Sequence, residues 1–293
     1  MGTDQGLSKN CRLFILWIAM SLTTACTGDR PDVYKSPPGY DFAHPTIIKL
    51  PFELDEVSGI AFYPTDTSLL MQVDETGNIY KMKLSNTSRI MKWKIAEARD
   101  YEDIVLLDST FYLLGSRGDI TVTSFIAENS VDTRDYPFPE AGNEFEILFY
   151  DPNLGKLVLI CKDCSEDGKK STTGYAFDPV SKQFIPNTLS INVKKINKLA
   201  DKNIGRFKPS AAAIHPVTGS LYIVSATDKL LVITDLQGEP KAAYELNPAL
   251  FKQPEGLTFS PSGTLIITNE AADIGMADVL IFRANKQGKS NEK

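Results

Sequence analysis

Two stretches far apart in the chain, PEGLTFSPSG at residues 254–263 and EVSGIAFYP at residues 56–64, carry nearly the same pattern of residues. Each is followed by a second apolar run that ends in acidic residues, LIITNE at 265–270 and LLMQVDE at 69–75. A short unit that recurs in this way cannot bury its apolar face alone, so it packs against further copies of itself. The pattern therefore indicates a repeat architecture.

The same unit recurs five times at a period of about 44 residues. Each copy holds a short β-branched or aromatic run, a turn rich in Gly, Pro and Asp, and two further apolar runs, and most copies add a more polar fourth run. Four strands at this period are typical of one blade of a β-propeller. We therefore predict an all-β protein with five four-stranded blades. The first strands are expected at residues 58–62, 102–106, 145–149, 210–214 and 255–259.

The two ends of the repeat predict how the ring closes. After Phe282 the chain turns polar without a fourth strand for the last blade, whereas an apolar run at residues 46–50 precedes the first blade. We expect this N-terminal strand to complete the C-terminal blade, which removes an exposed edge. The third copy is about 20 residues longer than the others, which leaves six blades as the alternative. Its extra residues, 193–205, space apolar side chains at helical intervals and predict a short helix, either a cap or a lid.

Composition places the chain among ordinary globular proteins. It has 293 residues, of which 42% are apolar and 23% charged. The formal net charge is −6 and the Lys and Arg residues are scattered, so the basic patch of a nucleic-acid-binding protein is missing. We expect a monomer that does not bind nucleic acid.

The N-terminal residues predict export and lipidation. Lys9 and Arg12 precede an apolar run at 13–22, which is too short for a membrane-spanning helix but suits a secretory signal peptide. Small residues then lead to Cys26, as in bacterial lipoprotein signals, in which the cysteine is acylated and becomes the new N-terminus. We expect a signal peptide at residues 1–25, a lipid such as palmitate on Cys26, and a lipoprotein anchored in the bacterial envelope that faces the periplasm or the cell surface. A simple cleaved signal or an uncleaved anchor is the alternative.

The remainder divides into three parts. Residues 26–44 are rich in Pro, Gly and Asp and predict a flexible tether, residues 45–285 are expected to form the propeller, and residues 286–293 a polar tail.

Within the propeller, Cys161 and Cys164 are the two cysteines left in an exported protein, which favours a disulfide between them. Free thiols, or a redox or metal role, remain the alternatives.

The predicted fold gathers acidic residues at one mouth of the central channel. In an antiparallel blade, the start of the first strand and the end of the second strand lie on the same face. Oxygen ligands converging there without histidine suit calcium, which is the candidate cofactor. The alternative is that the glutamates accept hydrogen bonds from the next blade and lock the ring. The candidate metal ligands are Glu56, Glu102, Glu144, Glu255 and Asn269, with Asp74 and Glu270 on the same face.

Catalytic constellations are not predicted. His215 lies in a turn on the opposite face and His44 in the tether, so a Ser-His-Asp triad has no base. Glu144 and Glu146 could form an acid and base pair, but alternation along one strand explains more simply why both face the same side.

Residues 56–62, residues 254–265 and the pair Asn269-Glu270 resemble the SdiA-regulated family of bacterial envelope proteins, and the resemblance spans about residues 46–284. It implies a secreted or lipid-anchored β-propeller without established enzymatic activity, with a divalent ion or an extracytoplasmic ligand as its candidate partner. The fourth copy departs from the motif at Ser210-Ala211, which would interrupt a ring of ligands. We therefore predict a non-catalytic binding or adhesion module. The alternative is a calcium-dependent hydrolase similar to the gluconolactonase and regucalcin propellers, whose ion polarises the substrate.

Overall fold

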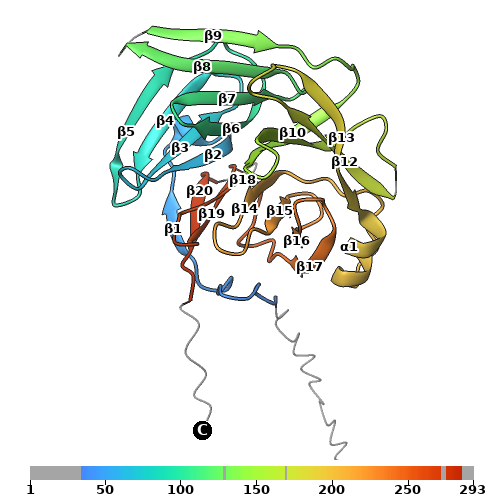
Figure 1. The fold of residues 1–293 in the computed structure, drawn as a ribbon. Coiled ribbons are helices and arrows are strands. Elements are labelled where there is room, and N and C mark those ends of the chain that lie inside the picture. Colours follow the sequence, from blue (N-terminus) through green and yellow to red (C-terminus); the bar gives the residue numbers. More distant parts are fainter. Residues whose placement is uncertain (1–33, 128–129, 169, 272–274, 286–293) are drawn as a thin grey trace, which may run out of the picture. The chain divides into compact units, whose positions relative to one another are not determined.

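Five antiparallel sheets of four strands each form a five-bladed β-propeller (Figure 1). The computed structural model describes residues 34–285 apart from 128–129, 169 and 272–274. Blade 1 comprises β2 (Val57–Tyr63), β3 (Ser68–Val73), β4 (Asn78–Lys83) and β5 (Asn86–Lys94). Blade 2 comprises β6 (Tyr101–Leu107), β7 (Thr110–Gly115), β8 (Ile120–Ala127) and β9 (Ser130–Tyr136). Blade 3 comprises β10 (Glu144–Asp151), β11 (Lys156–Asp163), β12 (Ser171–Phe177) and β13 (Phe184–Asn192).

The last two blades complete the ring. Blade 4 comprises β14 (Ala211–Ile214), β15 (Leu221–Ser225), β16 (Leu230–Thr234) and β17 (Pro240–Glu245). Blade 5 comprises β18 (Pro254–Phe259), β19 (Leu265–Asn269), β20 (Asp278–Phe282) and β1 (Thr46–Lys49). The N-terminal strand β1 pairs antiparallel with β20, from Thr46 opposite Ile281 to Lys49 opposite Asp278. The prediction of five blades closed by the N-terminal strand is confirmed.

The extra length of the third copy forms a helix and not a sixth blade. The helix α1 (Val193–Ala200) begins where the side chain of Asn192 accepts a hydrogen bond from the backbone N–H of Lys195. Val193 and Ile196 are fully buried in the apolar cluster between blades 3 and 4, so the helix covers that interface. A 3₁₀ turn, η1 (Phe52–Leu54), connects β1 to blade 1.

The glycine of the recurring motif has a packing role. A Cβ atom on Gly59 would lie 2.5 Å from the Cα of Asp103, in the inner strand of the next blade. At Gly256 a Cβ atom would lie 2.2 Å from the Oγ1 of Thr268 and 2.9 Å from Ile60. The inner strands therefore approach one another too closely for any larger residue at these two places.

Part of the predicted tether packs against the propeller. Tyr40 and Phe42 are only 6% and 4% exposed and belong to the apolar cluster between blades 4 and 5. The Tyr40 hydroxyl donates to the carbonyl of Gly263 at 2.7 Å. Residues 34–44 are therefore part of the fold, because the propeller buries two of their aromatic side chains. The composition of this segment, in contrast, predicts a flexible linker. Residues 26–33, Cys26, the signal peptide and the tail at 286–293 lie outside the described residues.

A membrane-spanning helix is not among the described elements: none of their helices combines the length and the apolar character that crossing a bilayer requires.

Candidate functional site

The inner strands of blades 1, 2, 3 and 5 open with β-bulges near the mouth of the channel. The pairing between inner and second strands shifts between Val57 and Ile60, Tyr101 and Asp103, Phe145 and Ile147, and Pro254 and Gly256. A bulge leaves a residue out of the ladder and changes the direction of its side chain. The residues at these places, together with the one that precedes the inner strand of blade 4, are Ser58, Glu102, Glu146, Ser210 and Glu255.

These five side chains line one polar cavity of about 210 Å³. The ends of the second strands add Asp74 from blade 1, Lys162 from blade 3 and Glu270 from blade 5, and Gln253 joins them from the segment before β18. The cavity therefore gathers five carboxyl groups around a single ammonium group. Because the five blades contribute equivalent strand ends, residues distant in sequence converge on one point.

Lys162 neutralises one side of the cavity. Its ammonium group forms a salt bridge with Glu146, whose side chain is 10% exposed. Burial alone would lower the pKa of Lys162, but the negative charges of Glu146, Glu255 and Glu102 raise it instead. Glu255 is raised to a pKa of about 8, first by burial and then by the charge of Glu146, with which it also shares a hydrogen bond. Glu146 and Glu255 therefore lie beside each other, with Lys162 paired to Glu146.

The opposite side, between blades 1 and 2, lacks such a counter-charge. Burial raises the pKa of Glu102 to about 9, and the charges of Glu146, Asp100 and Asp74 add to the rise. Burial, followed by a hydrogen bond to Asp100, raises the pKa of Asp74 to about 7. Among the described residues, neither Glu102 nor Asp74 forms a salt bridge with a Lys or Arg. Burial and mutual repulsion thus make both acids harder to ionise than free carboxyl groups.

Two of the predicted ligands lie in the cavity and three do not. Glu102 and Glu255 line it, whereas Glu56 and Glu144 are exposed outside its lining. Asn269 is 1% exposed, and its amide donates to the carbonyl of Leu250 at 3.0 Å and to Asp278 at 2.8 Å, which ties it into blade 5.

Sequence reasoning placed Glu146 only as a possible partner of Glu144. Aligning blade 3 on Glu146-Ile147 in place of Phe145-Glu146 would have matched it to Glu102-Asp103. Ser58 and Gln253 carry no distinctive signal of this kind.

Neighbouring blades are joined by hydrogen bonds from Ser210, which lines the mouth, and to Asp103, which follows a mouth residue in sequence. Asp103 is fully enclosed and accepts the backbone N–H groups of Ile104 and of Leu148 in blade 3, each at 2.8 Å. The Ser210 hydroxyl donates to the carbonyl of Pro254 at 2.6 Å, which joins blades 4 and 5. Glu102 and Asp103, adjacent in sequence, therefore face a cavity and a neighbouring blade respectively.

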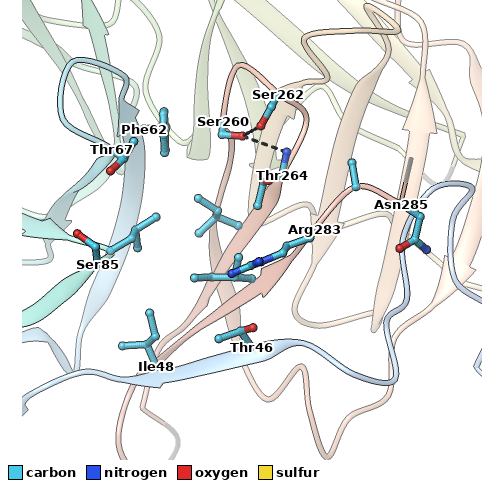
Figure 2. A pocket seen from close by; sticks show the side chains of 14 residues that line it. Thr46, Ile48, Phe62, Thr67, Ser85, Ser260, Ser262, Thr264, Arg283 and Asn285 are labelled. Carbon is cyan, nitrogen blue, oxygen red and sulfur yellow. Dashed lines mark hydrogen bonds between the residues drawn. The ribbon is translucent and has the colours of Figure 1, made fainter. Parts of the chain in front are cut away.

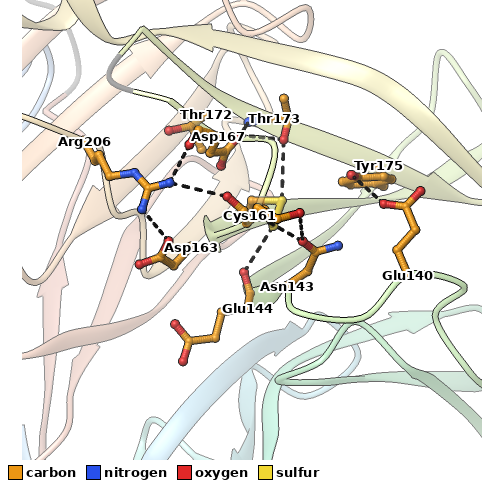
Figure 3. The surroundings of a disulfide bond; sticks show 12 residues. Glu140, Asn143, Glu144, Cys161, Asp163, Asp167, Thr172, Thr173, Tyr175 and Arg206 are labelled. Atoms are coloured by element: carbon orange, nitrogen blue, oxygen red, sulfur yellow. Dashed lines mark hydrogen bonds and ion pairs between the residues drawn. A yellow bond between two sulfur atoms is a disulfide. The ribbon is translucent and has the colours of Figure 1, made fainter.

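A disulfide closes the end of strand β11, in which Lys162 lies (Figure 3). It joins Cys161 to Cys164, so the closed loop contains only Lys162 and Asp163. Asp163 in turn pairs with Arg206 at 2.7 Å and with Lys208 at 2.9 Å. The two sulfur atoms are bonded to each other and do not offer thiolates to a metal, although the Asp167 carboxylate lies near them.

Comparisons with known proteins agree with this architecture. The model of the family described as SdiA-regulated matches residues 48–272. No curated protein matches the sequence.

Similar solved structures include a luciferin-regenerating enzyme, 12% identical with a TM-score of 0.50, which covers 82% of this chain and 95% of its own. Regucalcin, a calcium-binding protein from Agrobacterium tumefaciens, is 13% identical with a TM-score of 0.49, covering 78% of this chain and 91% of its own. A streptogramin B lyase is 10% identical with a TM-score of 0.47, covering 82% and 98% respectively. At 12% identity, the likeness to the luciferin-regenerating enzyme bears on the fold alone.

Proposed function

The chain belongs to the SdiA-regulated family. From that membership and from the carboxyl groups at the channel mouth, we propose that the protein is a non-catalytic binding module of the bacterial envelope. The ligand that we propose for the mouth is a divalent cation, with calcium as the first candidate. The observation that carries the proposal is the set of five acids in a cavity of about 210 Å³ with one ammonium group. Burying acids without counter-charges is costly, and a bound cation would offset that cost.

The donor set fits a hard cation. Calcium takes oxygen ligands only, and Glu102 and Asp74 would supply carboxylate oxygens while Ser58 would supply a hydroxyl. The positive charge of Lys162 favours the Asp74 and Glu102 side of the cavity for the ion. A bound cation would supply a fixed positive charge at the mouth, to which an extracytoplasmic ligand could bind.

Titration calorimetry of the full chain with calcium tests this proposal. We expect saturable binding and a rise in melting temperature, because an ion that binds only the folded state stabilises it. The change Glu102→Gln should weaken binding at least about tenfold, since it replaces a carboxyl group that can ionise on binding the cation with a neutral amide. Glu144→Gln is the matched control, because Glu144 is exposed outside the cavity, and it should bind as the parent does. No heat of binding and no thermal shift at millimolar calcium would contradict the proposal.

The envelope location is a second part of the proposal. It rests on the charged residues Lys9 and Arg12, the apolar run at 13–22 and the small residues before Cys26. Cells expressing the chain should incorporate labelled palmitate into it, and the protein should sediment with membranes. The variant Cys26→Ser should lose the label and the sedimentation. Labelling that persists in Cys26→Ser would show that another residue carries the lipid or that the anchor is of another kind.

The unequal protonation of the mouth favours one alternative, a calcium-dependent hydrolase. Glu255, with a pKa of about 8, would hold a proton near neutral pH, and Glu146 stands beside it against Lys162, so the two could act as acid and base. Lactone turnover with and without a chelator discriminates the two functions. Chelator-sensitive turnover that Glu255→Gln abolishes would replace the binding module with an enzyme, and its absence would leave the binding module as proposed.

A further inference from the structure

A second, larger cavity lies on the face of the propeller opposite the acidic mouth. It has a volume of about 850 Å³ and lies between blade 5 and blade 1, where the turns between strands meet (Figure 2). Ser260, Ser262 and Thr264 come from the turn after β18, Arg283 follows β20, and Ile48 lies on β1. We refer to this cavity as the blade 5–1 groove. Its size is that of pockets that hold small organic ligands.

The walls of the blade 5–1 groove are apolar and incompletely covered. Ile48, Phe62, Leu84 and Ile281 pack against the fully buried core of this interface but remain partly exposed. Ile266, which is fully buried, also belongs to the lining. Apolar surface that remains accessible inside a cavity is available to a ligand with an apolar body.

The neighbouring interface shows what fills such a groove. Between blades 4 and 5, Phe42 of the N-terminal segment makes tilted ring contacts, with its ring centroid 4.6 Å from that of Phe282 and 5.3 Å from that of Phe251. Tyr40 lies beside it and bonds to Gly263. The chain thus covers one interblade interface with its own aromatic side chains, whereas within the described residues no aromatic segment covers the next.

The polar groups of the blade 5–1 groove are arranged for an anion. Figure 2 shows the side chain of Arg283 extending from the end of β20 into the cavity, between Thr264 and Thr46. Arg283 forms no salt bridge with any residue that the structure describes. Beside it, the hydroxyls of Ser260 and Ser262 lie 2.9 Å apart, and the Ser260 hydroxyl accepts the backbone N–H of Thr264 at 3.1 Å. One cation and several hydroxyls therefore border an apolar cavity.

We propose that the blade 5–1 groove binds an aliphatic monocarboxylate, such as a medium-chain fatty acid. Its carboxylate would pair with the Arg283 guanidinium, whose planar donors match the two oxygens of one carboxylate. Its alkyl chain would lie along Ile48, Phe62 and Ile281. A single guanidinium matches a single negative charge, so a polyanion would leave charge unpaired. This site is separate from the acidic mouth and does not depend on the function proposed there.

Photoaffinity labelling of the full chain tests the proposal. The reagent is decanoic acid that carries a diazirine near its methyl end, with the labelled peptides identified by mass spectrometry. We expect labels on peptides that contain Ile48, Phe62 or Ile281, and competition by unlabelled decanoate. Decanamide, which has the same chain without the charge, should compete at least about tenfold more weakly. Equal competition by decanamide would overturn the proposal.

Two variants separate recognition of the charge from occupation of the cavity. Arg283→Gln should reduce labelling at least about tenfold, whereas Arg134→Gln, a change at an exposed arginine on blade 2, should leave it unchanged. Ala284→Trp places a large side chain at an exposed lining position and should prevent labelling without changing the melting temperature. If that variant does not fold, Arg283→Gln decides alone. Labelling of Arg283→Gln at the parental level would overturn the proposal.

Discussion

At the scale of single residues, equivalent places in different blades use different side chains for the same backbone task. In the turn after β14, Nδ1 of His215 accepts the backbone N–H groups of Val217 at 3.1 Å and Thr218 at 3.2 Å. In the turn after β10, Oδ1 of Asp151 accepts the corresponding N–H groups at 2.8 and 3.3 Å. A ring nitrogen that accepts two hydrogen bonds cannot also hold a proton, so His215 stabilises its turn only when neutral.

This arrangement predicts how stability changes with pH. His215 is 8% exposed among Tyr40, Tyr222 and Phe259, and burial lowers its pKa below the ordinary value of 6.5. The unfolded chain then binds more protons than the folded chain below about pH 6.5, so this contribution to stability is present above that pH and is lost as the pH falls. His215→Asn keeps an acceptor but cannot titrate. The fall in melting temperature between pH 7.5 and pH 5 should be smaller in His215→Asn than in the parent, and an unchanged fall would contradict the assignment.

At the scale of elements, most of the secondary structure and topology can be predicted from the regular spacing of apolar runs in the sequence. The strands, the five blades and the closing strand follow from apolar runs that recur at a constant spacing, because each blade must repeat the same packing. Spacing alone does not identify Glu146, because blade 3 has a second irregularity, between Glu144 and Phe145, beside the bulge that it shares with blades 1, 2 and 5, and such irregularities depend on contacts between strands. The burial of Tyr40 and Phe42 is not predicted for a related reason. Two aromatic residues in a segment rich in Pro and Gly are buried only if the folded propeller offers a surface for them to pack against.

The loop closed by the disulfide is an element whose role can be measured. Cys161 and Cys164 enclose Lys162, which faces Glu146 at the mouth. The double change of both cysteines to serine should lower the free energy of unfolding by about 2 kcal/mol, the chain-entropy contribution of so short a loop. Lys162 should also become less well positioned, so calcium titration of this variant should give an affinity different from that of the parent.

The pair of changes Lys35→Ala and Lys252→Ala serves as a control, because both residues lie outside the lining of the acidic mouth. An unchanged unfolding free energy in the double serine variant would show that Arg206 and Lys208 hold the turn through Asp163 without the disulfide.

At the scale of the whole molecule, closure by the N-terminal strand makes the ends of the fold depend on each other. Lys49 on β1 pairs with Asp278 on β20 at 2.8 Å, across almost the full length of the chain. Leu50 and Leu54, which follow β1, are fully buried in the interface between blades 5 and 1. The first and last blades are therefore held together by a segment that precedes both in sequence, and blade 5 is incomplete without it.

Truncation tests that dependence. A chain that begins at residue 51 lacks β1, which exposes the edge of β20, and an unpaired strand edge pairs with strands of other molecules. We expect this chain to melt at a lower temperature than the parent and to form oligomers, measured by calorimetry and by light scattering after gel filtration. A chain that begins at residue 34 keeps β1, Tyr40 and Phe42 and should match the parent in both measurements. A monomer of parental stability from the shorter chain would mean that blades 1 to 4 and three strands of blade 5 suffice to close the ring.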